Sequence, residues 1–90
     1  MNAEERQAAI VEKNKELVKL LTSSDWKERE RGELLFIREK RNNLNAMLKK
    51  YKIGELDFTP NCSFELLVEQ LNAMTSYLNI LELRATFEKF

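Results

Sequence analysis

Residues 64–87, FELLVEQLNAMTSYLNILELRATF, decide the fold, because their apolar side chains recur with a helical period. One row of apolar side chains comprises Leu67, Leu71, Met74, Leu78, Leu81 and Ala85. A neighbouring row comprises Leu66, Ala73, Tyr77, Ile80 and Phe87. A helix that is apolar over so much of its circumference has to be covered from more than one side. We therefore predict a helix over residues 62–88 that presents two apolar faces.

Two further helices are predicted upstream, over residues 3–22 and 26–53, and the only loop of any length covers residues 55–61 with Pro60. Asp25 is a candidate N-cap because Glu28 follows three residues later, and Gly54 is a candidate C-cap. Either Thr59 or Ser63 could cap the last helix. Gly32 predicts a close helix approach or a bend. The chain is thus expected to be one all-α domain, residues 1–90, dominated by an antiparallel hairpin of its second and third helices.

Composition excludes most chemistry. The chain has 90 residues, no histidine and a single cysteine, Cys62, so it lacks a histidine-based nucleophile, a cysteine-based zinc site and an internal disulfide. No apolar run approaches the length of about 18 residues that a membrane span needs, and the N-terminus is too charged for a signal peptide. We expect a non-catalytic protein without cofactor or bound metal, without a membrane partner, in a reducing cytoplasm.

The second apolar row of residues 62–88 is difficult to cover within so short a chain. Leu35 and Phe36 also point away from the expected core face of residues 26–53. We therefore expect a homo-oligomeric helical bundle whose interface comprises Leu66, Ala73, Tyr77, Ile80, Phe87, Leu35 and Phe36. The alternative is a compact three-helix monomer with a wide core.

The net charge of zero conceals an asymmetry along the chain. Residues 25–55 carry nine bases and six acids, a net +3, whereas residues 56–90 carry two bases and five acids, a net −3. At about 100° per residue, six of the nine bases fall within about 40° of one line along the helix. This basic arc comprises Lys27, Arg31, Arg38, Arg41, Lys49 and Lys52, contains no acid and has Leu34 as its one hydrophobe. The core face is expected about 100° away, through Trp26, Ile37, Leu44, Leu48 and Tyr51.

An acid-free row of arginines and lysines suits an anionic partner, because both side chains donate to phosphate. Terminal aromatic residues could stack on a base, and carboxamides beside the arc could bind its edge. The expected ligand-binding set is Lys27, Arg31, Arg38, Arg41, Asn42, Asn45, Trp26 and Tyr51. The alternative is that acids of residues 62–88 pair with the arc, or that it is merely solvated. Zero net charge argues against duplex nucleic acid as the partner.

Two other features have mainly structural interpretations. Glu30 and Glu33 lie near the expected core face, and a carboxylate pair could in principle serve a metal or acid–base chemistry. Without histidine, an ion pair with Arg84 or with another subunit is favoured. Cys62 has no activating neighbour in the sequence and is expected to be a small cap-region residue.

The segments Asp25-Trp26-Lys27-Glu28-Arg29 and Gln70-x-x-Ala73-Met74-x-x-Tyr77 carry a family resemblance. With Leu44, Leu48 and residues 62–84 they resemble a family of small all-helical accessory proteins of tailed phages, including crAss-like phages. The resemblance covers about residues 25–86 and leaves residues 1–20 outside it. It implies a phage origin and the host cytoplasm as the place of action, and it transfers no settled activity.

These observations lead to two functional hypotheses. The first is a counter-defence protein that binds and sequesters an anionic small ligand, such as a (cyclic) nucleotide immune signal. The second is an inhibitor or scaffold that binds a host protein through exposed helix faces.

Overall fold

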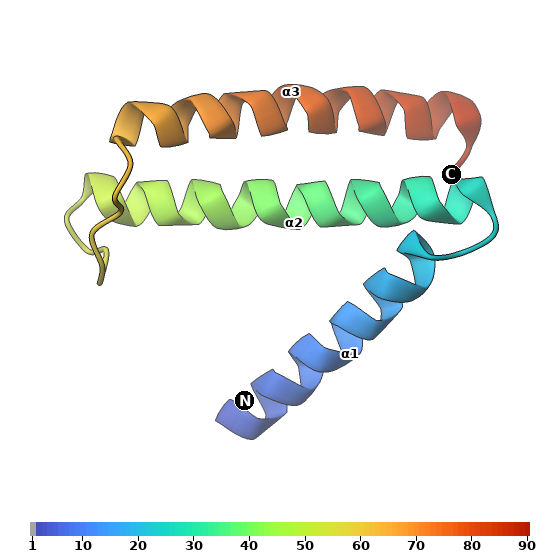
Figure 1. The fold of residues 1–90 in the computed structure, drawn as a ribbon, viewed down its shortest axis with the longest axis horizontal. Helices are drawn as coiled ribbons and strands as arrows, with labels where there is room; N and C mark the ends of the chain where they lie inside the picture. Colours follow the sequence, from blue (N-terminus) through green and yellow to red (C-terminus); the bar gives the residue numbers. More distant parts are fainter. Residues whose placement is uncertain (1) are drawn as a thin grey trace.

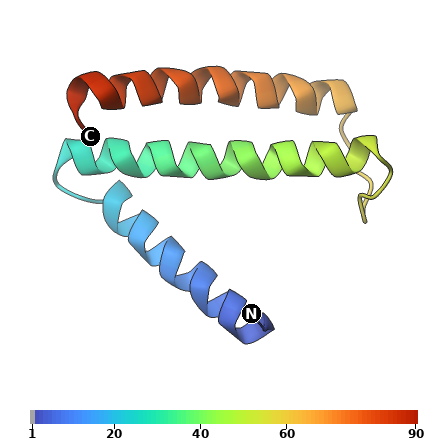
Figure 2. The ribbon, with the colours of Figure 1, turned by 180° about the vertical axis from the view of Figure 1, so that it is seen from behind.

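The computed structural model describes residues 2–90, and within them the chain forms three α-helices and no strand. These are α1 (Ala3–Leu21), α2 (Trp26–Lys52) and α3 (Phe64–Glu88). Helices α2 and α3 lie side by side and antiparallel, and α1 leaves the start of α2 at an angle (Figures 1 and 2). The predicted all-α class and the predicted hairpin are confirmed, with helix ends shifted by two residues at most.

Each helix of the hairpin begins at a side chain that caps its N-terminus. Asp25 accepts a hydrogen bond from the backbone N–H of Lys27 at 3.0 Å, which confirms it as the N-cap of α2. Ser63, not Thr59, caps α3 by accepting from the N–H of Leu66 at 3.1 Å.

Helix α2 ends in a Schellman motif. Gly54 adopts φ +76° there, and the N–H of Glu55 donates to the carbonyl of Lys50 at 2.8 Å. Because only glycine adopts this conformation without strain, Gly54 turns the chain into the loop as predicted.

The core lies between α2 and α3. Its buried side chains are Leu34, Leu48, Leu67, Leu78 and Leu81. Leu34, Leu78 and Leu81 form one cluster, against which Ile37 and Ala85 pack. The first apolar row of α3 is therefore the row that packs within the chain.

The core face of α2 differs from the prediction at three positions. Leu34, expected on the basic arc, is buried, whereas Trp26 and Tyr51 are exposed. The reason is their place along the hairpin. Leu34 lies in the interior of α2, more than two turns from its start, where Leu78 and Leu81 cover it. Trp26 and Tyr51 lie in the first and last turns of α2, where each packs against a single ring, that of Phe90 or Phe64, and stays partly exposed. The line of contact with α3 is thus closer to the basic arc than the sequence pattern suggested.

Helix α1 packs on α2 alone and makes no contact with α3. The contact lies at Gly32, where an added Cβ would come within 3.0 Å of the Leu20 Cβ and 3.1 Å of the Leu21 side chain. Gly32 therefore permits a close helix approach, one of its two predicted roles. α1 therefore covers no part of the apolar surface of α3. α1 buries no residue, and Ile10, Val11 and Val18 are exposed.

The splayed α1 makes a single chain extended. The Cα radius of gyration is 15.7 Å, compared with about 12 Å for a compact domain of this length. A single chain is therefore not the compact three-helix bundle that was the alternative expectation. None of the helices within residues 2–90 is long and apolar enough to cross a lipid bilayer.

Candidate ligand cleft and the basic arc

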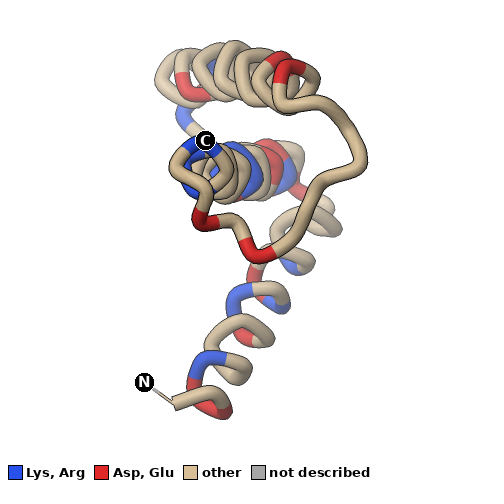
Figure 3. The backbone as a smooth tube through the Cα atoms, turned by 90° about the vertical axis from the view of Figure 1, so that its left-hand side faces the viewer, with Lys and Arg blue, Asp and Glu red and all other residues tan. Residues whose placement is uncertain are grey.

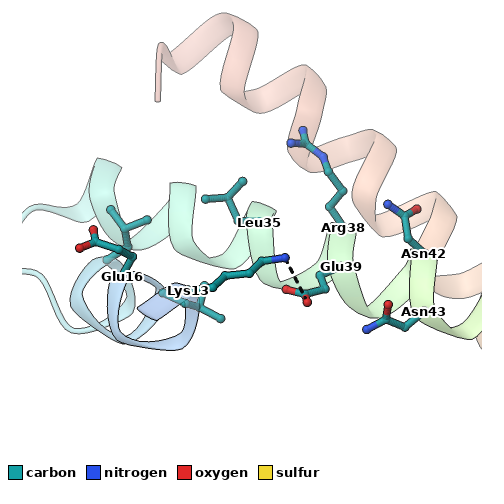
Figure 4. A pocket seen from close by; sticks show the side chains of 9 residues that line it. Lys13, Glu16, Leu35, Arg38, Glu39, Asn42 and Asn43 are labelled. Atoms are coloured by element: carbon teal, nitrogen blue, oxygen red, sulfur yellow. Dashed lines mark ion pairs between the residues drawn. The ribbon is translucent and has the colours of Figure 1, made fainter. Parts of the chain in front are cut away.

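A concavity with a volume of about 410 Å³ lies between α1 and α2. Leu17, Leu20 and Leu35 provide its apolar surface, and its other lining residues are Lys13, Glu16, Arg38, Glu39, Asn42 and Asn43. An ion pair between Lys13 Nζ and Glu39 Oε1, 3.2 Å apart, spans the cleft (Figure 4). Small-molecule sites usually have volumes of about 300–1,000 Å³ with mainly apolar walls, and the cleft fits this range.

The basic arc adjoins one edge of this cleft. Arg38 and Asn42 belong both to the predicted ligand set and to the cleft lining, and they project from α2 on the side away from the Lys13–Glu39 pair (Figure 4). Since the cleft itself contains two bases and two acids, any preference for an anion has to come from the Arg38 edge.

Two arginines of the arc are held by α3. Arg38 Nη2 lies 3.4 Å from Glu82 Oε1, and Arg41 Nε donates to the Thr75 hydroxyl at 3.1 Å. Arg41 Nη1 also donates to Asn42 Oδ1 at 3.3 Å. The guanidinium group has five N–H donors, so both side chains are oriented while keeping donors for a ligand. Pairing with the acids of the last helix is thus realised at Arg38 alone.

The other four bases of the arc, Lys27, Arg31, Lys49 and Lys52, are exposed and form no ion pair within residues 2–90. Seen end-on, the hairpin carries most of its basic positions on α2 (Figure 3). The predicted asymmetry of charge between the two helices therefore persists as a surface property.

The aromatic residues of the predicted set lie at opposite ends of α2. Trp26 packs edge-on against Phe90, with ring centroids 6.3 Å apart. The ring centroids of Tyr51 and Phe64 are 5.2 Å apart. The 25 residues that separate Trp26 from Tyr51 correspond to about 37 Å of helix. One small ligand cannot reach both, so the structure brings together Arg38, Arg41 and Asn42 and keeps the two aromatic side chains apart.

The remaining predicted residues take different positions. Asn45 is half-buried on α2. Leu35 and Phe36 are exposed, and Leu35 contributes to the wall of the cleft. Four α1 residues complete the cleft: Lys13, Glu16, Leu17 and Leu20. They were missed because an exposed amphipathic helix does not itself indicate what it faces.

A polar network links the hairpin on the other side of the core. Arg84 Nη1 donates to Glu30 Oε2 at 3.4 Å, which confirms the predicted ion pair for one of the two glutamates. Glu33 instead accepts a hydrogen bond from the Tyr77 hydroxyl. That bond raises the pKa of Tyr77, with smaller contributions from burial and from the charges of Glu33 and Glu30. Each glutamate thus has a partner, as the structural interpretation of this pair requires.

The fold and the cleft define a small helical-hairpin protein with an added N-terminal helix and a basic arc. Residues 24–87 match the sequence model of the Sequestin family, so the chain belongs to the Sequestin family. The match spans the hairpin and leaves α1 outside it. The family's name is consistent with a role in sequestering another molecule. No curated protein and no solved structure matches the chain.

Proposed function

We propose that this protein binds and sequesters an anionic small ligand of the nucleotide class without converting it. The observation that carries the proposal is the position of the basic arc beside the α1–α2 cleft, with Arg38 at their shared edge. Membership of the Sequestin family supports the sequestering role.

The cleft offers the two kinds of surface that a nucleotide requires. Leu17, Leu20 and Leu35 would contact the base or sugar, and the Asn42 carboxamide would bind a base edge. The phosphate would lie at Arg38, which is already oriented by Glu82, with Arg41 next to it. Arg31, which has no ion pair within the described chain, lies two turns before Arg38 and would add long-range attraction.

The proposed place of action suggests which nucleotide is bound. The resemblance to phage accessory proteins supports a counter-defence role in the host cytoplasm, where a cyclic nucleotide immune signal would be the ligand. Sequestration requires tight binding and an adequate protein concentration, and no catalytic group. The chain would act as a homo-oligomer, since an exposed apolar face remains on α3.

The proposal is tested by thermal unfolding with a panel of cyclic mononucleotides, cyclic dinucleotides and linear mononucleotides. A ligand at 100 times its Kd stabilises the native state by about 2.7 kcal/mol, a shift of several degrees in the melting temperature. Native mass spectrometry of protein purified from cells that produce the signal should show a retained small molecule, which is released intact on denaturation. If no nucleotide shifts the melting temperature and nothing is retained, the proposal is wrong.

Matched variants locate the site. Arg38→Gln should abolish the ligand-induced shift. Lys40→Gln, which removes an exposed base of α2 outside the arc, should preserve it. Equal effects of the two substitutions would show that the binding is nonspecific attraction to α2.

The second candidate function is inhibition of a host protein, favoured by the exposure of Leu35 and Phe36 and of the outer side of α3. In that case the basic arc would steer the encounter. The protein would then capture one host protein reproducibly, and nucleotides would leave its melting temperature unchanged.

A further inference from the structure

One side of α3 is apolar, exposed and regularly spaced. Leu66, Ala73, Ile80 and Phe87 are separated by seven residues each and are all exposed, with Ile80 at 55% and Phe87 at 80%. Tyr77 lies on the same side, four residues after Ala73. We call these five residues the outer face of α3. A repeat of seven is the spacing at which a helix keeps one side against another helix.

The accessible surface area of the single chain is larger than that of a compact protein of the same mass. Its accessible area is 6929 Å², whereas a compact protein of 10.7 kDa exposes about 5,500 Å². The excess of about 1,400 Å² exceeds the roughly 800 Å² that each partner buries in a standard interface. This excess includes the exposed α1 as well as the outer face, and an interface of standard size between the outer faces of two copies lies within it.

The side chains along this face complement one another in the antiparallel direction. With two α3 helices related by a two-fold axis near Tyr77, Ala73 faces Ile80 of the partner subunit, a small side chain against a large one. In the same register Glu69 faces Arg84 of the partner subunit. Within residues 2–90 Glu69 has no ion-pair partner, and Arg84 uses one of its five N–H donors on Glu30.

The parallel arrangement lacks both kinds of complementarity. Ala73 would face Ala73 of the partner subunit and leave a gap, and Arg84 would face Arg84 of the partner subunit with repulsion between like charges. We infer that the outer face of α3 pairs with the same face of a second copy, antiparallel, with Ala73 opposite Ile80 of the partner subunit. This register rests on the proposed self-association and is independent of the ligand proposal.

Disulfide trapping tests the register. Since Cys62 is exposed, the experiment uses a Cys62→Ser background with either Ala73→Cys or Ile80→Cys. The two reduced variants are mixed, equilibrated and oxidised with oxidised glutathione. The expected main product is a dimer that joins positions 73 and 80, identified by peptide mass spectrometry, while each variant alone gives little dimer. Efficient crosslinking of Ala73→Cys to itself would show a parallel pair and overturn the register.

A second pair of variants keeps the test independent of crosslinking. Ile80→Glu should convert the dimer into a monomer in sedimentation equilibrium. Leu83→Glu, which lies off the outer face and is 61% exposed, should leave it dimeric. Both sites are exposed in the single chain, so circular dichroism should show the same helicity for both. A wild-type chain that stays monomeric at all concentrations overturns self-association, and a dimer unaffected by Ile80→Glu overturns the choice of face. The nucleotide-induced shift, measured separately, decides the ligand proposal.

Discussion

The Tyr77 hydroxyl of α3 donates a hydrogen bond to the Glu33 carboxylate of α2, beside the ion pair of Arg84 with Glu30. On the other side of the leucine core, Arg38 pairs with Glu82 and Arg41 with Thr75. Polar links therefore flank the core on both sides. Because each link requires one particular pairing of positions, together they favour a single register of the hairpin over sliding of one helix along the other.

The Tyr77–Glu33 hydrogen bond predicts a pH dependence of stability. Since the bond needs the protonated hydroxyl, the pKa of Tyr77 is higher in the folded chain than in the unfolded chain. Its contribution is complete below the ordinary tyrosine pKa of about 10 and is lost as the pH rises through the folded value. The charged groups around it are Glu33, Glu30 and Arg84.

Urea unfolding between pH 8 and 11 checks this dependence. The free energy of unfolding should decrease more steeply above pH 10 in the wild type than in Tyr77→Phe, since lysine titration is common to both. Parallel curves for the two proteins would show that the hydrogen bond is not coupled to folding.

Truncation of the central core residue should be costly. Leu81 is 1% exposed, and Leu81→Ala should lower the free energy of unfolding by about 2–5 kcal/mol through lost burial and the cavity left behind. Leu83→Ala, at a 61% exposed site two residues later, should change it by less than about 0.5 kcal/mol. Chemical denaturation of both variants at one protein concentration measures the difference, and similar losses would contradict the assignment of the core.

Enlargement of Gly32 should detach α1. Any larger side chain meets Leu20 and Leu21, which lie 3.0 and 3.1 Å from an added Cβ, so Gly32→Leu should displace α1 and leave the hairpin intact. Hydrogen exchange should then be fast throughout residues 3–21 and unchanged in the core of α2 and α3. Ala46→Leu places the same side chain at an exposed position of α2 and should leave α1 in place. Loss of the nucleotide-induced shift in Gly32→Leu alone would assign one wall of the site to α1.

The N-cap of α3 should contribute measurably to stability. Ser63→Ala removes the acceptor for the Leu66 N–H and should lower the free energy of unfolding by about 0.5–2 kcal/mol. The control is Ser76→Ala in the middle of α3, where the serine is exposed and forms no side-chain hydrogen bond within the described chain. That substitution should be neutral or slightly stabilising, since alanine has the higher helix propensity. Equal losses in the two variants would contradict the role of Ser63.

Local patterns predicted the helices well. The apolar period, the caps at Asp25 and Gly54 and the breaker Pro60 placed the ends of α2 and α3 within two residues of those observed. They did so because capping and helical periodicity involve residues close together in the chain. The choice between Thr59 and Ser63 was left open, since both can cap and only the path of the loop selects one.

The candidate site was predicted in part. The angular position of Arg38, Arg41 and Asn42 on α2 follows from helix geometry alone, and the structure places these three side chains together. The cleft itself depends on Lys13 and Leu17 of α1, and no periodicity within one helix reveals the direction in which another helix leaves it.

The sequence by itself determined that the chain is helical and that the bases concentrate on one arc, because both depend on spacing along a single helix. It also determined that α2 and α3 form a hairpin, because a short loop joins two long amphipathic helices. The tertiary structure decided that α1 lies on α2 alone, that Leu34 belongs to the core while Trp26 and Tyr51 do not, and that Arg38 is shared between the cleft and Glu82. These depend on the angle and offset at which whole helices meet, which many weak contacts set together.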